Sequence, residues 1–285
     1  MKETTEKTTE KTTEKNSTSP ERPLRRMMLT IAYDGTAYHG FQKQASGAPT
    51  IEGTLNEVLS RVFKEDIEVI GASRTDTGVH AYGNLAVFDT HARIEASKLP
   101  YALNRVLPPD IRVLCGEEVP QGFHPRKCDT IKTYEYHIYS APFELPQKRL
   151  YSYWTYNSFD IEKMRRAAGY LIGEHDFTSF CSTGSSSPSK IRTIYSIEIE
   201  NESVFEDEET EAGNAPGDIV IRISGNGFLY NMVRIIAGTL MEAGRGRIAP
   251  EKVKDILDAR DREAAGPTAP AKGLTLIGYE FLQTF

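Results

Sequence analysis

Apolar residues recur with two different periods along the first half of the chain. Runs rich in β-branched and other apolar residues stand at 27–33, 84–90 and 111–119, which is typical of strands. Residues 50–64 instead carry apolar side chains three and four positions apart, and a second run with this spacing begins at Leu99. The first half is therefore predicted to form strand, helix, strand, helix, strand.

The second half has a similar order. Residues 132–140 alternate as a strand does, and Asp160 is a suitable N-cap for the helix that follows. The remaining predicted elements are strands near 192–199 and 219–223 and helices at 231–243 and 250–257. Two α+β halves of similar order predict a duplicated architecture around a central mixed or antiparallel sheet, with a ligand cleft between the halves.

The pattern divides the chain into three parts. Residues 1–24 are rich in Thr, Glu and Lys and carry few apolar side chains, so we expect a disordered tail. Residues 25–129 form the first half and residues 130–285 the second. An acidic segment at 198–218 interrupts the second half and is expected to be a loop insertion in a hairpin.

Composition narrows the class of protein. Hydrophobic residues make up 39% and charged residues 26%, as in a soluble globular protein. No apolar run approaches the roughly 18 residues of a membrane span, and the N-terminus lacks the apolar core of a secretory signal. The three cysteines (Cys115, Cys128 and Cys181) share no Cys-x-x-Cys spacing, which argues against a disulfide framework and favours a cytoplasmic protein.

The formal net charge of −6 is distributed unevenly. Residues 198–218 hold nine acidic residues and no Lys or Arg, so the rest of the chain carries about +3. Overall acidity therefore does not exclude an RNA partner, because binding depends on the local field and on the phosphates neutralised. It does not argue for one either.

The segment 71–81 is the first candidate site. It is poor in apolar residues yet lies between two predicted strands, as expected of a loop held by a rigid scaffold. Arg74 and Asp76 stand two residues apart and can approach the same partner. A neighbouring arginine lowers the pKa of a carboxyl and keeps it ionised, as a nucleophile requires. A surface ion pair in a turn is the alternative interpretation.

Two further clusters carry candidate chemistry. In 224–234 a strand ends at two glycines and a helix follows, with Arg234 in its first turn; a cation there gains nothing from the helix dipole, so an anion should lie near it. The alternative is a surface arginine bonded to a loop carbonyl. Segments 123–126 and 132–136 combine aromatic and basic residues, as surfaces that bind unstacked RNA bases do, although half-buried strand aromatics are as common.

The six histidines give no sign of a metal site. Their positions include no His-x-x-x-His or His-Glu-x-x-His spacing. The chain also lacks a glycine-rich phosphate loop of either standard spacing, and Gly-Asn-Gly at 225–227 is a weak match to a dinucleotide motif. We therefore expect neither a metal nor a cofactor.

Several motifs stand in a characteristic order along the chain. They are 33–42, the Arg74-Thr75-Asp76 loop, Asn104 with 107–111, 123–126, 132–136, 173–177, 192–194, 228–234 and 268–274. In this order and spacing they resemble the tRNA pseudouridine synthase A family, over essentially residues 27–282. Several ordered motifs together are far more specific than any one of them.

The resemblance implies a fold, a reaction and partners. It implies the α+β pseudouridine synthase fold, with two related halves around a central sheet, in a homodimer without metal or cofactor. The implied reaction detaches uracil from its ribose, rotates it and rejoins it through C5, without net oxidation or hydrolysis. The implied substrates are uridines of the tRNA anticodon stem–loop, at tRNA positions 38, 39 and/or 40.

The resemblance also implies roles for individual residues. The family's aspartate nucleophile falls on Asp76, the arginine two positions before it on Arg74, its base-stacking tyrosine on Tyr134, and a further cleft arginine on Arg234. Whether the aspartate attacks the sugar C1′ or the base C6, or removes a sugar proton, stays open. The other motif residues expected to bind substrate are Lys132, His80, Phe123 and Leu229.

The chain departs from the family pattern at two positions. Thr77 stands where the family usually has alanine, and Phe41 where tryptophan is common. Each could change the packing of a loop. The acidic segment 198–218 would repel phosphates if it covered the RNA-binding groove, so we expect it to point away from bound tRNA.

Two other functions compete with this interpretation. A non-catalytic protein that binds structured RNA would carry basic and aromatic clusters, but it would not need Asp76 between two arginines. A hydrolase with paired carboxylates would need a second acid beside Asp76, and Asp34 is one choice.

Overall fold

The computed structural model describes residues 23–185, 187–203 and 217–283. The tail predicted at 1–24 lies outside the described residues as far as residue 22. The strands are β1 (Arg25–Tyr33), β2 (Ile70–Gly71), β3 (His80–Thr90), β4 (Ile111–Val119), β5 (Thr130–Ser140), β6 (Tyr153–Thr155), β7 (Gly173–Asp176), β8 (Ile191–Ser203), β9 (Gly217–Gly225) and β10 (Leu274–Phe281). The α-helices are α1 (Ile51–Phe63), α2 (Leu99–Leu103), α3 (Ile161–Gly169), α4 (Met232–Gly244) and α5 (Lys252–Ala259), with short 3₁₀ helices at Ala96–Lys98, Thr178–Phe180, Arg262–Ala264 and Ala271–Gly273.

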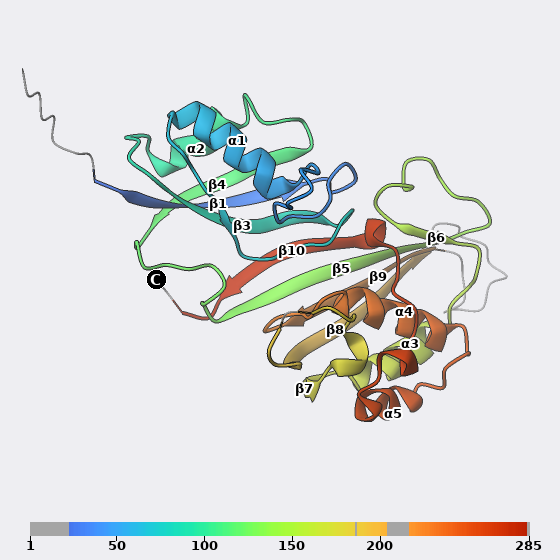
Figure 1. The fold of residues 1–285 in the computed structure, drawn as a ribbon. Coiled ribbons are helices and arrows are strands. Elements are labelled where there is room, and N and C mark those ends of the chain that lie inside the picture. The colour runs from blue at the N-terminus through green and yellow to red at the C-terminus, as the bar shows by residue number, and fades with distance from the viewer. Residues whose placement is uncertain (1–22, 186, 204–216, 284–285) are drawn as a thin grey trace, which may run out of the picture.

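All ten strands of the described residues belong to one sheet (Figure 1). Its order is β4-β1-β3-β10-β5-β9-β8-β7, with β2 beside β3 and β6 beside β5. Neighbouring strands are antiparallel except for β10 with β3 and β5 with β6, which are parallel. The predicted α+β fold with a mixed sheet is thus confirmed.

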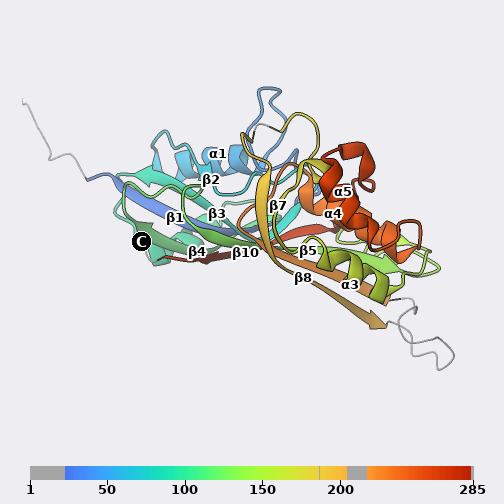
Figure 2. The ribbon, with the colours of Figure 1, turned by 90° about the horizontal axis from the view of Figure 1, so that it is seen from below.

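The two faces of the sheet differ in polarity. The helices α1 and α4 lie on the same side of it (Figure 2). Tyr136 and Ile138 of β5 are fully buried in the main hydrophobic core, as their alternation predicts. The other side carries polar cross-strand pairs, such as Thr133 with Ser224 and Glu135 with Arg222. A sheet with one packed and one polar face is ordinary for antiparallel strands.

Local signals explain where two of the helices begin. Helix α1 follows Thr50, whose hydroxyl accepts from the Gly53 amide, and buries Ile51, Leu55, Val58 and Leu59. Helix α3 follows Asp160, whose carboxylate accepts from the Lys163 amide, so the predicted N-cap is confirmed. No described helix has the length and apolar character needed to cross a membrane.

The last strand, β10, joins the two halves of the sheet. It lies between β3 and β5 and pairs with both, although the sequence pattern predicts no strand there. Leu276 at its centre is fully buried, next to Ala81 of β3 and Tyr134 of β5. A strand with neighbours on both sides, whose register also shifts between Leu276 and Gly278, lacks a clear apolar-polar alternation, so periodicity alone does not reveal it. The short strands β6 and β7 were missed as well, and β7 is polar in sequence.

The acidic segment is partly strand, which corrects the expected loop at 198–218. Strand β8 continues to Ser203 and β9 begins at Gly217, so the acidic residues at both ends of this segment lie in the sheet. Glu198 stands opposite Arg222, an arrangement that stabilises two charged residues on the polar face. Residues 204–216, and with them the expected direction of the loop, lie outside the described residues.

The central position of β10 leads to a prediction for stability. Leu276→Ala should lower the free energy of unfolding by about 2–5 kcal/mol, because it leaves a cavity in the middle of the sheet. Leu114→Ala is the matched control, since Leu114 of β4 is 56% exposed; it should cost no more than about 0.5 kcal/mol. Urea unfolding measures both values, and equal losses would contradict the structural role of β10.

Candidate active site

A buried asparagine holds the loop that carries Asp76. Asn84 of β3 is fully buried, and its amide nitrogen donates to the Ser73 carbonyl (3.0 Å) and to the Tyr33 hydroxyl (3.1 Å). Its side-chain oxygen accepts from the Tyr279 hydroxyl of β10 at 2.9 Å. The Tyr33 hydroxyl in turn lies 2.7 Å from that of Thr75. Buried, satisfied polar networks of this kind make a loop rigid.

A second segment, at Gly40 and Phe41, supports the same loop from the other side. The Phe41 amide donates to the Thr75 carbonyl at 3.0 Å. Gly40 has a φ of +86°, and a Cβ atom there would stand 2.7 Å from that carbonyl oxygen. Phe41 is buried, and its ring fills the space beside Gly71. The close approach therefore requires glycine at position 40, while the phenylalanine noted as a departure packs well.

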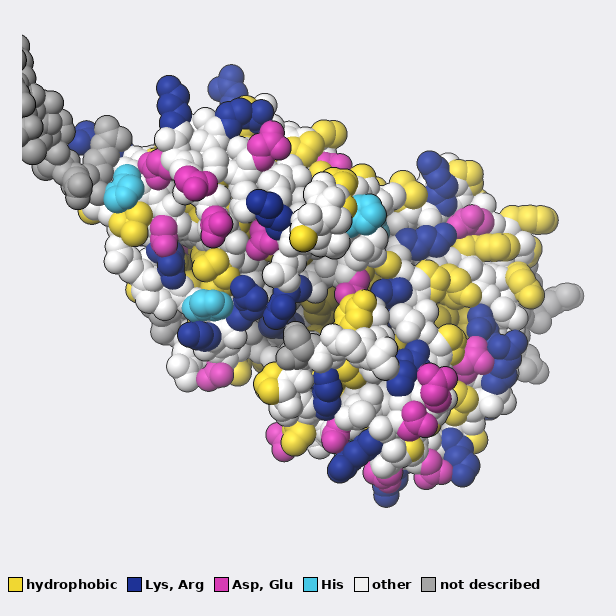
Figure 3. Space-filling view, viewed as in Figure 1, with side chains coloured by type: hydrophobic (Ala, Val, Ile, Leu, Met, Phe, Trp, Pro, Cys, Tyr) yellow, Lys and Arg dark blue, Asp and Glu magenta, His cyan; other side chains and the backbone are white. Residues whose placement is uncertain are grey.

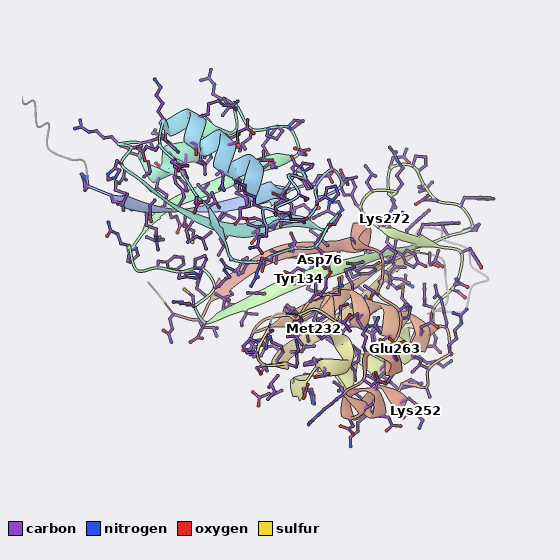
Figure 4. The ribbon with its side chains drawn as sticks, viewed as in Figure 1. Asp76, Tyr134, Met232, Lys252, Glu263 and Lys272 are labelled. Carbon is purple, nitrogen blue, oxygen red and sulfur yellow. The ribbon has the colours of Figure 1, made fainter. Side chains whose placement is uncertain are left out.

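Asp76 meets Arg234 between the two halves of the molecule. The Arg234 guanidinium lies 3.4 Å from the Asp76 carboxylate, and both side chains are largely shielded from solvent. Arg234 also donates to the Asn231 side chain and to the Ala269 carbonyl, each at 2.7 Å. The anion expected beside the first turn of α4 is thus present. Figure 4 shows Asp76 and Tyr134 close together above the central strands.

The pKa of Asp76 departs from the expected direction. Burial raises this pKa, and the charge and hydrogen bond of Arg234 only partly offset the effect. Arg234 thus lowers the pKa as a neighbouring arginine is expected to, but the net shift is upward, because desolvation outweighs this attraction. Arg74 contributes nothing to it: its side chain is exposed, and among the described residues no hydrogen bond or ion pair joins it to Asp76.

The aromatic side of the site consists of Tyr134 and Phe228. Tyr134 is nearly buried, and its ring meets the edge of Phe228 with the centroids 5.3 Å apart. Burial raises the pKa of the Tyr134 hydroxyl to about 12, so the phenol is neutral at physiological pH. The rigid ring is therefore available as an apolar surface for a flat ligand.

A cleft of about 720 Å³ opens above these residues and takes its lining from both halves. It contains Asp76, Arg74, Tyr134, Lys132 and Leu229, so the fold brings five of the predicted site residues together. Its charges are unequal: among the described lining residues Asp76 is the single carboxylate, against five cations, Lys43, Arg74, Arg126, Lys132 and Arg192. The space-filling view shows Lys and Arg side chains gathered beside the hollow between the halves (Figure 3). Such a cleft favours an anionic ligand.

Two predicted substrate-binding residues lie elsewhere. His80 is buried beside a different cavity, of about 660 Å³; its ring accepts from the Gly35 amide and meets the Leu150 carbonyl. Burial lowers the pKa of His80, which favours the neutral ring. Phe123 packs in a small second core, with its ring centroid 6.1 Å from that of Phe281. His80 is the first residue of β3 and Phe123 lies in the loop between β4 and β5, and both are packed outside the cleft.

Other contributors to the site were not predicted as such. Asn84, Ser73 and Phe228 hold or complete the site, and Arg126 and Arg192 add charge to the cleft. All but Asn84 stand inside or next to the quoted motifs, whereas Asn84 appears only as the start of a predicted strand. Asp34, the second acid that a paired-carboxylate hydrolase would need, lines the His80 cavity and accepts from Thr36 and Tyr151. The described residues contain no group of three potential metal ligands.

One rigidly held carboxylate in a basic, partly aromatic cleft is an arrangement suited to an enzyme with an anionic substrate. The family model described as tRNA pseudouridine synthase matches residues 29–126 and 167–281. A tRNA pseudouridine synthase A of Thermoanaerobacter sp. (strain X514) is 46% identical over 254 residues, covering 89% of this chain and 98% of the relative. That of Bacillus subtilis (strain 168) is 44% identical over 253 residues, covering 88% and 97%. The chain belongs to the tRNA pseudouridine synthase family, and its sheet and helices are consistent with that family's fold.

The contact between Gly40 and Thr75 leads to a prediction for the loop. Gly40→Ala should lower the free energy of unfolding more than Gly47→Ala, by about 1 kcal/mol or more. Gly47 is the matched control: its φ is also positive, at +74°, but nothing lies within 4 Å of an added Cβ atom. It therefore reports the backbone cost alone, and the difference reports the clash with Thr75. Equal losses in urea unfolding would show that this contact does not constrain the loop.

Proposed function

We propose that the protein isomerises uridine to pseudouridine in tRNA, with Asp76 as the catalytic carboxylate. The observation that carries the proposal is the buried Asp76–Arg234 pair in a cleft whose remaining charged lining residues are basic. An RNA strand supplies the negative charge that such a cleft attracts. The membership of the tRNA pseudouridine synthase family agrees with this reaction.

The target base must leave its stack to reach Asp76. Extruding a nucleotide costs a few kcal/mol, and stacking on an aromatic side chain contributes roughly 1–3 kcal/mol. Tyr134 supplies this aromatic surface, because its ring lines the cleft and is fixed by Phe228. Arg74 is exposed at the rim and free of Asp76, so it is available to fill the vacated stack or to hold the displaced backbone.

Asp76 then drives the exchange of one bond for another. The N1–C1′ bond breaks, a C5–C1′ bond forms, N1 gains a proton and C5 loses one, so no oxidant or water is consumed. The carboxylate has three ways to start this exchange: attack on C1′, addition to C6, or removal of a sugar proton. Each requires Asp76 in its ionised form. A raised pKa makes that carboxylate more basic, and Arg234 offsets part of the rise and so favours the ionised form.

The finer features of the function are part of the same proposal. We propose that the target uridines lie in the anticodon stem–loop, at tRNA positions 38–40. We propose also that the enzyme works as a homodimer in the cytoplasm. The support for these points is the resemblance to the family. Mass spectrometry of tRNA modified by the enzyme tests the target positions, and sedimentation of the free protein tests the homodimer.

The role of Asp76 can be tested by the release of tritium from tRNA labelled at uridine C5. Asp76→Asn should reduce release at least about a thousandfold, because the nucleophile is lost. Binding of tRNA should persist, since the cations of the cleft remain. Asp258→Asn, an exposed carboxylate of α5, is the control and should release tritium at the wild-type rate.

Three outcomes of this assay decide between the functions. Release unchanged in Asp76→Asn would remove Asp76 from the chemistry. Binding of tRNA without release by the wild-type protein would favour the non-catalytic RNA-binding alternative. Free uracil or cleaved RNA as product would favour a hydrolase.

The ion pair predicts a shift in pH dependence. Activity requires ionised Asp76, so it is present above the pKa of this group and lost as the pH falls through it. In a plot of kcat/KM against pH, activity falls on the acid side as Asp76 is protonated, and this fall is the acid limb. Burial of Asp76 moves the acid limb above the usual aspartate pKa, and Arg234 moves it back toward lower pH. Arg234→Gln should therefore move the limb of kcat/KM to higher pH.

Two variants control for the loss of structure at Arg234. Arg234→Lys retains the positive charge and should leave the limb near its wild-type position. Arg247→Gln removes an arginine that pairs with Glu242 rather than with Asp76, and it should not move the limb. A limb at the same pH in Arg234→Gln would contradict the coupling between Arg234 and Asp76.

A further inference from the structure

Three cations meet at one end of the cleft. Arg126 comes from the loop between β4 and β5, Lys132 from β5, and Arg192 from β8. The sheet register explains why they are close: Lys132 stands opposite Gly225 of β9, and Gly225 stands opposite Ile194 of β8. We refer to Arg126, Lys132 and Arg192 as the basic cluster.

Glycines of β9 and of the loop after it lie next to the basic cluster. At Gly227 an added Cβ atom would lie 3.6 Å from Nε of Arg192. At Gly225 it would stand 2.7 Å from the Thr193 carbonyl oxygen, so a side chain cannot be placed between Lys132 and β8 without a shift. Strands β8 and β9 thus approach each other closely beside the basic cluster, with glycine where a side chain would clash.

No carboxylate neutralises the basic cluster among the described residues. None of its members takes part in an ion pair there; Arg192 donates to the carbonyls of Ser189 and Ile191 and to the Ser187 hydroxyl. The ammonium group of Lys132 lies 5.6 Å from the centre of the Tyr279 ring. By contrast, Arg222 on the polar face of the same sheet pairs with Glu135 at 2.5 Å. In the part of the chain that the structure describes, the basic cluster thus lacks the carboxylate partner that Arg222 has on the polar face.

The free protein bears an electrostatic cost at this point. Burial, together with the smaller effects of the Arg192 and Arg126 charges, lowers the pKa of Lys132 to about 8. Unpaired, partly desolvated cations that repel one another are stabilised by an anion placed among them. A phosphate group can accept hydrogen bonds from all three at once, since it has several oxygens and at least one full negative charge.

The distance to the aromatic surface identifies which phosphate fits. Lys132 and Tyr134 are two residues apart on β5, so they project from the same face about 6.6 Å apart. A nucleotide's own sugar separates its base from its flanking phosphates by a comparable length. A base on Tyr134 therefore places one of its own phosphates at the basic cluster.

We infer that Arg126, Lys132 and Arg192 form a subsite for a single RNA backbone phosphate that flanks the target uridine. The inference rests on the proposed function, because it needs a uridine at Tyr134. Phosphate contacts fix register and orientation without reading sequence. The subsite thus acts as the fixed point about which the base turns out of the stack and toward Asp76.

Salt dependence of tRNA binding gives the first test. Lys132→Gln should bind tRNA about tenfold more weakly than the wild type, as expected for the loss of a hydrogen bond between charged groups. The slope of log K against log salt should become shallower by about 0.7–0.9, the contribution of one phosphate. Lys254→Gln removes an exposed lysine of α5 and is the charge-matched control, with no change in either quantity. An unchanged slope in Lys132→Gln overturns the inference.

Neutral phosphates give the decisive test. We would ligate tRNAs that carry one methylphosphonate, which lacks the negative charge, at each phosphate next to the uridine that the wild-type enzyme converts. At one position the wild type should lose about tenfold in affinity, while Lys132→Gln loses nothing further, because the partner of that phosphate is already gone. Arg192→Gln should show the same loss of sensitivity at the same position.

If the loss of affinity from the substitution and the loss from the methylphosphonate simply add at every position, the subsite is overturned. The cations of the cleft would then attract the RNA only as a diffuse basic field. Circular dichroism of each variant excludes unfolding as the cause of weaker binding. Wild-type protein that forms no pseudouridine in unmodified tRNA would instead overturn the proposed function, and the subsite with it. Pseudouridine formation combined with additive losses would overturn the subsite alone.

Discussion

The burial of one negative charge between the two halves of the molecule is the constraint on which the site depends. An isolated buried carboxylate is costly unless it is paired and hydrogen-bonded. Asp76 lies on a loop of the first half, and its partner Arg234 lies 158 positions further along the chain, on α4. Asn84 holds the loop and Asn231 holds the arginine, so the pair exists only when both halves are assembled.

Charges elsewhere in the sheet follow a different rule. On the polar face, Arg222 and Glu135 neutralise each other across neighbouring strands. In the cleft, cations from several elements stand without carboxylate partners among the described residues, and Asp76 is engaged by Arg234. Unpaired cations lower the stability of the free protein but raise its affinity for an anion. Both effects are expected of a surface that binds RNA. Nine of the 40 acidic residues of the chain lie in 198–218, which opposes this surface in charge. The parts of this segment that lie in β8 and β9 are toward the ends of these strands away from Arg192 and Gly225.

Local patterns predicted much of the fold. Strand β4 has the predicted bounds, α1 lies within the predicted 50–64, and α3 begins after its predicted N-cap, Asp160. The failures share a cause. Strand β10 is enclosed on both sides and its register shifts between Leu276 and Gly278, and β7 is polar, so neither shows the apolar-polar alternation of an exposed strand. The acidic segment looked like a loop, because its composition hides the strand pairing that orders both ends.

The sequence by itself determined the order of most of the elements and the motifs, because periodicity and motif spacing are properties of neighbouring positions. The resemblance carried by those motifs made Asp76 the candidate for the central residue. Tertiary structure alone decided that Arg234 and not Arg74 pairs with Asp76, and that His80 and Phe123 lie outside the cleft. It also placed β10 at the centre of the sheet, where Tyr279 reaches Asn84 across 195 positions. Contacts of this range depend on strand order and side-chain direction, which no local pattern encodes.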